Sequence, residues 1–143
     1  MKALVLGLLA LLLALPALAG APELMKERMK GFEAAYLEFQ TSLMRHDFTG
    51  MQGAMAKLNN QGTLPGPVRA AIRASFDDRD FGNYLRLDEY TRLMADEVTQ
   101  AAQTRDAQKV LIAQGRLVMG CVQCHDGFKA RATQAMERAA QAE

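Results

Sequence analysis

The sequence predicts an all-α protein, an antiparallel four-helix bundle, and three observations support that prediction. Apolar residues recur at steps of three and four over several long stretches, which is the period of a helix buried along one side. No stretch alternates polar and apolar residues with the period of two expected for a strand. Turn-forming residues leave only short connections between the stretches, and amphipathic helices joined in this way pack antiparallel.

The first 19 residues are typical of a secretory signal peptide, so the domain is expected to begin after them. Lys2 precedes an unbroken apolar run over residues 3–15, which is too short to span a bilayer. The run is followed by Ala-Leu-Ala at residues 17–19, a pattern of small residues that signal peptidase recognises. We therefore expect a periplasmic protein that begins at Gly20 and is not held in the membrane after cleavage.

Residues 20–143 number 124, which is enough for one domain with a single core and too few for two ordinary ones. Without Lys2, the 17 lysines and arginines become 16, equal to the 16 aspartates and glutamates. A formally neutral chain lacks the cationic surface that nucleic acid requires, so nucleic-acid binding is excluded as a function class.

The first predicted helix spans residues 23–43, where one apolar seam alternates steps of four and three. Pro22 stands in a first helical turn, which tolerates proline, and charged residues occupy the other faces. We expect the seam to belong to the core. The seam consists of Met25, Met29, Phe32, Tyr36, Phe39 and Leu43.

A break between residues 45 and 50 precedes a second, shorter helix. Met51, Met55 and Leu58 have helical spacing in that stretch. His46 falls in the break, and we interpret it as an exposed loop residue rather than a ligand.

The strongest break in the chain covers residues 59–67, where Asn, Gly and Pro residues interrupt any helix. Two apolar sets with helical spacing follow it, and we expect them to form a third helix with a bent start that reaches Gln103. The short set is Val68, Ile72 and Phe76, and the long set is Leu87, Tyr90, Met94, Val98 and Ala101.

The last predicted helix begins at Thr104 or Asp106, either of which can cap its first turn. Its apolar stripe continues toward the end of the chain and includes a cysteine. The stripe consists of Val110, Leu117, Cys121, Phe128, Ala132 and Ala135.

Cys121-Val122-Gln123-Cys124-His125 is the C-x-x-C-H string of covalent haem attachment. Two thiols at this spacing reach the two vinyl groups on one edge of the porphyrin, and the adjacent imidazole reaches the iron. Offsets of three and four residues share one face of a helix. Because the apolar stripe of the last helix includes Cys121, we expect that face to point inward.

Three other uses of the cysteine pair compete with haem attachment. A disulfide between residues three apart closes too small a loop to stabilise much, and it leaves His125 without a role. A thioredoxin-like dithiol follows a strand, and no strand is predicted. A zinc site needs four ligands, whereas beyond the motif the sequence has one further histidine, His46, and no further cysteine. Haem attachment is therefore the favoured interpretation.

The opposite, distal side of the iron is expected to be covered from upstream. Only 18 residues follow His125, and Met136 is the only methionine among them. That residue lies on the same helix, about 16 Å further along it, and cannot reach the other side of the iron. The first helix, with Met25, Met29 and Phe32, is the expected distal wall.

In this layout the chain resembles the cytochrome c′ family, the four-helix class II cytochromes whose haem motif lies in the last helix. Residues 121–129, Cys-x-x-Cys-His-Asp-Gly-Phe-Lys, are similar to the closing pattern of that family, in which an aromatic and then a basic residue follow the histidine. Here these residues are Phe128 and Lys129, and Lys129 also fits an ordinary surface lysine. The resemblance covers residues 20–143 in length and layout.

The first helix is similar to the family as well. Glu-Leu-Met at residues 23–25, followed by Arg28 and then Phe32, resembles the pattern that places an arginine near a haem propionate and an apolar residue over the iron. Many relatives carry a tryptophan at the start of the third helix, whereas this sequence has none, so the packing of that region is expected to differ.

The resemblance implies one covalent haem c held by Cys121 and Cys124, with a five-coordinate iron. It implies that His125 is the proximal ligand, that Phe32 covers the distal face and that Arg28 pairs with a propionate. Taken alone, Arg28 also fits a solvated surface charge.

Met29 is the competing distal residue, because it lies one turn before Phe32 and a thioether is a good sixth ligand for haem iron. A shift of the helix by one turn exchanges the two residues, and the apolar period does not distinguish shifts of three from shifts of four. The spacing of Arg28 and Phe32 favours Phe32.

No nucleophile and base are recognisable in the sequence, so we expect a haem protein that is not an enzyme. Electron transfer with redox partner proteins is the first functional hypothesis, and binding of nitric oxide or carbon monoxide at an open distal position is the second. With Met29 as sixth ligand, the protein would be a low-spin electron carrier. A helical binding or chaperone-like module with an incidental motif is a third hypothesis. The resemblance also allows a homodimer through the first two helices.

Overall fold

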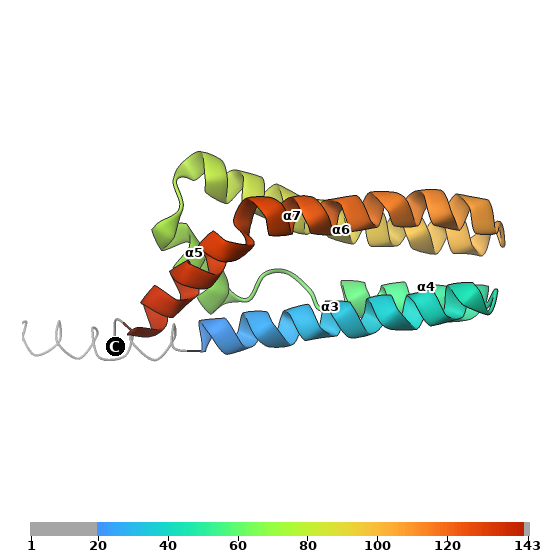
Figure 1. Cartoon of the computed structure of the whole chain (residues 1–143), viewed down its shortest axis with the longest axis horizontal. Coiled ribbons are helices and arrows are strands. Elements are labelled where there is room, and N and C mark those ends of the chain that lie inside the picture. Colours follow the sequence, from blue (N-terminus) through green and yellow to red (C-terminus); the bar gives the residue numbers. More distant parts are fainter. Residues whose placement is uncertain (1–19, 142–143) are drawn as a thin grey trace, which may run out of the picture.

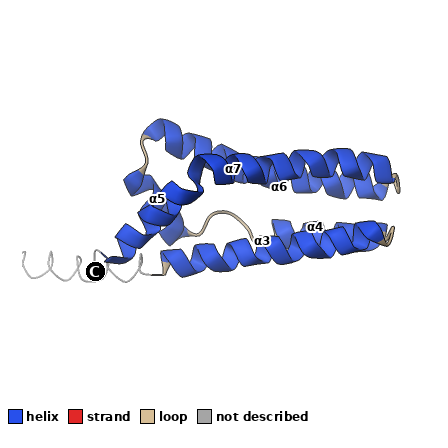
Figure 2. Ribbon diagram, viewed as in Figure 1, coloured by secondary structure: helices blue, strands red, loops and turns tan. Residues whose placement is uncertain are grey.

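The computed structural model describes residues 20–141, which form five α-helices joined by short turns (Figures 1 and 2). The helices are α3 (Ala21–Met44), α4 (Phe48–Asn59), α5 (Gly66–Ser75), α6 (Asp78–Gln103) and α7 (Ala107–Gln141). No strand occurs within the described residues, so the all-α prediction is confirmed for them. The signal peptide predicted over residues 1–19 lies outside this range. None of the five helices is both long and apolar enough to cross a membrane.

Two helical hairpins make up most of the described chain (Figure 1). α3 and α4 are joined by residues 45–47, and α6 and α7 are joined by residues 104–106. α4 packs against α6 and so connects the two hairpins, while α5 lies at one end and contacts α3 and α7. The later part of α7 turns away from the direction of α6 toward α5 (Figure 1). This turn brings the end of α7 into the same region as the start of α3.

Aspartate side chains define where three of the helices begin. Asp47 accepts a hydrogen bond from the Gly50 amide at 2.9 Å, and Asp77 accepts one from the Asp80 amide at 2.8 Å. Asp106 accepts from the Gln108 amide at 3.0 Å, which confirms the second of the two capping residues predicted for the last helix. Each contact satisfies an amide that the helix itself leaves without a partner.

His46 lies in the turn between α3 and α4, where it is exposed and has a φ of 54°. The left-handed backbone conformation ends the helical hydrogen bonding of α3 and lets the chain reverse within three residues. Its predicted place in an exposed loop is confirmed.

The prediction of a single bent third helix is wrong, because its two parts are separate helices. Phe76 has an extended backbone, with φ −109° and ψ 146°, which ends α5. Asp77 then caps α6 as a new helix. The apolar spacing of Val68, Ile72 and Phe76 runs up to this break. All three residues belong to α5 or its end and point into the same cluster.

The core consists of two apolar clusters. The hairpin cluster fills the space between the two hairpins and includes Phe39, Met51, Met55, Val98, Val110 and Leu117. The α5 cluster lies at the other end and includes Met25, Val68, Ile72, Phe76, Tyr84, Phe128 and Met136. The Phe128 ring lies 5.8 Å from that of Phe76 and 5.7 Å from that of Tyr84, measured between centroids, so aromatic contacts join α5, α6 and α7 there.

The seam predicted for the first helix is rotated in the structure. The buried residues of α3 include Met25, Arg28, Ala35, Phe39 and Ser42. Four predicted seam residues, Met29, Phe32, Tyr36 and Leu43, are only half-buried at its edge. The rotation arises because Arg28, which the apolar pattern treats as polar, lies in the middle of the buried face.

Candidate functional site

The two cysteines of the motif lie at the edge of the buried stripe of α7, and the histidine lies outside it. Cys121 and Cys124 are half-buried free thiols, whereas His125 is exposed. Measured around the helix from the fully buried Leu117, these three residues are displaced by about 40°, −20° and 80°. The exposure of His125 shows that the expectation of a wholly inward face is wrong for this residue. Its direction around the helix does not explain the exposure, since Ala132 and Met136, at about 60° and 100° in the same measure, are buried.

Gly120 lets α7 approach α6 closely just before the first cysteine. A Cβ atom at this position would lie 2.9 Å from Cδ1 of Tyr90 and 3.3 Å from Oγ1 of Thr91. Only a residue without a side chain fits this contact, so Gly120 determines how near Cys121 lies to α6.

The Gly120→Ala variant is expected to unfold more easily than wild type, by about 1–3 kcal/mol, because the added methyl group must displace the Tyr90 ring or separate the helices. Urea unfolding measures the change. Gly115→Ala is the matched control, since Gly115 is exposed on the same helix with nothing within 4 Å of a Cβ. That substitution should stabilise the protein by about 0.5–1 kcal/mol, and equal effects of the two alanines would contradict the prediction.

The environment of the two thiols keeps them protonated at neutral pH. Burial raises the pKa of the Cys121 thiol. Burial, with a further contribution from the negative charge of Asp88, raises the pKa of the Cys124 thiol to about 11. A thioredoxin-like dithiol requires the opposite, a thiol pKa lowered by nearby positive charge. The structure gives that alternative no support.

Arg28 is a buried partner in an ion pair rather than a surface charge. Its Nη1 atom lies 2.7 Å from Oδ1 of Asp88, and its side chain is 4% exposed, against 11% for Asp88. Its Nη2 atom donates a hydrogen bond to the carbonyl oxygen of Gly62 at 3.0 Å. The solvated alternative for Arg28 is therefore wrong. Arg28 joins α3, the loop that follows α4, and α6.

Sequence reasoning missed Asp88, which lies in the same region as the cysteines. Asp88 is on α6, one turn after the buried Tyr84, and its charge is close enough to raise the pKa of both the Cys124 thiol and the Tyr84 hydroxyl. Arg92 follows one turn later, with its Nε atom 3.9 Å from Oδ2 of Asp88. The signal in the sequence was the position of Asp88 within one turn of Tyr84 on one side and Thr91 on the other. Both of these residues are buried in the structure.

The two candidate distal residues belong to different parts of the core. Phe32 packs against the hairpin cluster, and the guanidinium carbon of Arg28 lies 4.6 Å from the centre of its ring. Met29 packs against the α5 cluster, as Cys124 does. Both residues are half-buried on the same helix, but only Met29 shares an apolar cluster with a residue of the motif.

Two further residues of the last helix take different positions. Met136 is buried in the α5 cluster on the same helix as the motif. Lys129 is exposed, which agrees with a surface lysine. Within residues 20–141, no three His, Cys, Asp or Glu side chains are grouped so that they could hold a metal ion by themselves.

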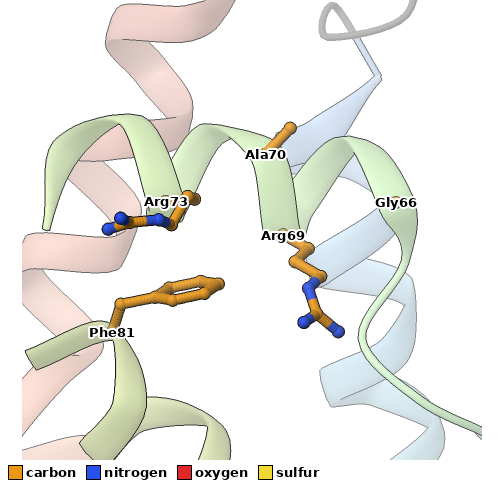
Figure 3. Close-up of a pocket in the computed structure, with 5 residues that line it drawn as sticks. All are labelled: Gly66, Arg69, Ala70, Arg73 and Phe81. Carbon is orange, nitrogen blue, oxygen red and sulfur yellow. The ribbon is translucent and has the colours of Figure 1, made fainter. Parts of the chain in front are cut away.

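Neither cysteine lines either of two hollows on the surface of residues 20–141. One, of about 400 Å³, lies beside α5, where the guanidinium groups of Arg69 and Arg73 lie 5.8 and 5.2 Å from the centre of the Phe81 ring. Figure 3 shows these two side chains extending from α5 on the side of the Phe81 ring, which comes from α6. The other, of about 610 Å³, lies between α6 and α7 and is bordered by Tyr90 and Gln123. Phe128, three residues after His125, also borders this hollow.

Comparisons of the chain with models of protein families, with curated proteins and with solved structures found no match.

Proposed function

We propose that this protein is a periplasmic mono-haem c-type cytochrome of the cytochrome c′ kind. The haem would be held covalently by Cys121 and Cys124, with His125 as the proximal ligand. One observation supports this most: the complete C-x-x-C-H string lies on a single helix, with both cysteines half-buried beside an apolar cluster and the histidine free at the surface next to them.

The arrangement of the helices agrees with this proposal. In this proposal the four longer helices α3, α4, α6 and α7 would make up an antiparallel four-helix bundle with the haem motif on its last helix, and α5 would be an additional helix in the long connection. The motif lies where α7 comes close to α6 and where α3 also contacts α7. In this proposal residues 1–19 act as the export signal.

The residues around the motif fit a haem group. The thiols are free and one turn apart, which is the state and spacing needed for addition to two vinyl groups. The buried Nε atom of Arg28 has no hydrogen-bond partner among the described residues, and in this proposal a haem carboxylate would be its partner. A bound haem supplies a one-electron redox couple and, where the sixth position of the iron is open, a site for a diatomic gas. The α5 cluster would exclude water from one side of it.

Electron transfer is the function that these features support best, because it requires only a haem whose edge lies near the surface, and His125 is exposed. Binding of nitric oxide or carbon monoxide is the second candidate. It is favoured by Phe32, an apolar ring held by the Arg28 guanidinium, which would cover an open distal position without binding the iron. Neither role is enzymatic.

The test is the covalent attachment itself. The full chain is produced in a bacterium that exports proteins and attaches haem c, and denatured protein is extracted with acidified solvent and stained for haem. Wild type should retain one haem per chain, whereas Cys121→Ala with Cys124→Ala should retain none. Val122→Ala, inside the motif but not bonded to haem, is the matched control and should retain it. A wild-type protein that loses all haem on extraction would overturn the proposal.

A further inference from the structure

The ion pair between Arg28 and Asp88 has a second arginine, Arg92, beside it. Two guanidinium groups, those of Arg28 and Arg92, flank the single carboxylate of Asp88. Only Arg28 is close enough to Asp88 for a hydrogen bond, because the Nε atom of Arg92 lies 3.9 Å from the nearer carboxylate oxygen. The side chain of Arg92 is 30% exposed and that of Arg28 is 4% exposed. The group therefore carries one uncompensated positive charge in a largely desolvated position.

Both arginines also keep a donor that nothing satisfies. The Nε atoms of Arg28 and Arg92 are buried and make no hydrogen bond within residues 20–141. A buried N–H without a partner typically costs 1–3 kcal/mol, and a buried charge without a partner costs more. Two such donors beside one shared carboxylate indicate a place for a second anion.

We propose that Arg28 and Arg92 together form a binding site for a carboxylate, which we call the seat, and that this carboxylate is a propionate of the haem. Asp88 is the positioning residue that holds the two arginines for it. This inference rests on the proposed haem attachment and extends it. Arg28 alone is implied by the resemblance to cytochrome c′, whereas Arg92 and Asp88 are assigned from the unsatisfied donors and the charge imbalance.

The placement of the group relative to the motif supports this assignment. Arg28 and Asp88 are close enough to Cys124 to act on its charge, so the seat lies in the immediate region of the attachment point. The charged and titratable side chains that make ion pairs or act on one another there include those of Arg28 from α3, Tyr84, Asp88 and Arg92 from α6, and Cys121 and Cys124 from α7. Guanidinium is the preferred partner for a carboxylate, because its planar group of N–H donors matches the two oxygens.

The test is the midpoint reduction potential of the haem-loaded full chain. Positive charge near a propionate disfavours the ferric haem, which carries one more positive charge than the ferrous form. Arg92→Gln should therefore shift the ferric to ferrous ratio at a fixed ambient potential about tenfold toward ferric, which is 59 mV for one electron. Arg92→Lys keeps the charge and should stay close to wild type.

Arg86→Gln is the matched control, because it removes the same charge from the same helix at an exposed side chain that is hydrogen-bonded only to the neighbouring Asn83. Screening by salt should keep its effect well below that of Arg92→Gln. In an Asp88→Asn background, where Arg92 is no longer positioned, Arg92→Gln should shift the ratio by much less than tenfold.

The outcomes separate this inference from the function on which it rests. Covalent haem is measured first in every sample, and a wild type without it would overturn both. A loaded wild type in which Arg92→Gln and Arg86→Gln shift the potential equally would overturn the seat while leaving haem attachment in place. An unchanged effect of Arg92→Gln in the Asp88→Asn background would overturn the positioning role of Asp88.

Discussion

Replacing Arg28 with leucine is expected to lower the free energy of unfolding by about 3–5 kcal/mol, because the substitution leaves the Asp88 carboxylate buried without its hydrogen-bonded partner. That loss is a large fraction of the 5–15 kcal/mol typical of a whole domain. The substitution also removes the donor to the Gly62 carbonyl, so the loop that follows α4 loses its attachment to α3. Urea unfolding followed by circular dichroism measures the change.

A surface ion pair of the same length provides the control. Lys57 Nζ lies 2.7 Å from Oε2 of Glu38, but the two side chains are 61% and 44% exposed. Because solvent screens such a pair, Lys57→Met should cost no more than about 1 kcal/mol.

The double variant Arg28→Leu with Asp88→Leu should recover much of the loss, since an apolar pair of similar volume needs no compensating charge. Equal effects of Arg28→Leu and Lys57→Met would show that burial of the pair does not contribute to stability.

The second large effect concerns the spin state of the reduced haem. If Phe32 covers the distal face, wild type should be high-spin when reduced and should form a nitric oxide adduct, because no side chain occupies the sixth position. Met29→Ala should then leave the visible spectrum unchanged. Phe32→Ala should remove the lid and speed the binding of carbon monoxide, which stopped-flow absorbance measures.

A methionine away from the motif makes the comparison specific. Met44, at the other end of α3, is 81% exposed, so Met44→Ala should not alter the spectrum under either assignment. A low-spin reduced spectrum that becomes high-spin only in Met29→Ala would replace Phe32 with Met29 as the distal residue. The protein would then be a simple electron carrier.

The helices themselves could be predicted from sequence because each has an apolar period and a recognisable beginning. Pro22 in the first turn of α3 and Asp106 at the start of α7 marked their boundaries to within two residues. The separation of α5 from α6 could not be predicted in this way. Val68, Ile72 and Phe76 have helical spacing up to the break, and the break depends on the extended backbone of one residue and the cap made by Asp77.

The site was only partly predictable for a different reason. The C-x-x-C-H string is a local pattern, so Cys121, Cys124 and His125 could be found without any structure. The burial of Arg28 depends on Asp88, which lies 60 residues away in the sequence, and no local pattern reports such a pair. Likewise, the exposure of His125 depends on which neighbours cover α7, whereas helical spacing gives only relative directions around the axis.

The bond from Arg28 to the Gly62 carbonyl has a consequence for how the chain opens. Next to it, the end of the Gln61 side chain lies against Gly31 of α3, so the loop also contacts α3 beside this hydrogen bond. Local unfolding of α5 that carries this loop with it must therefore also break the bond between Arg28 and Gly62, and Arg28 is the residue that contacts Asp88. Amide hydrogens of the loop, of α5 and of the α6 turn around Asp88 should then exchange with solvent through one shared opening. We expect the same opening to control the access of water to the surroundings of Met29 and Cys124.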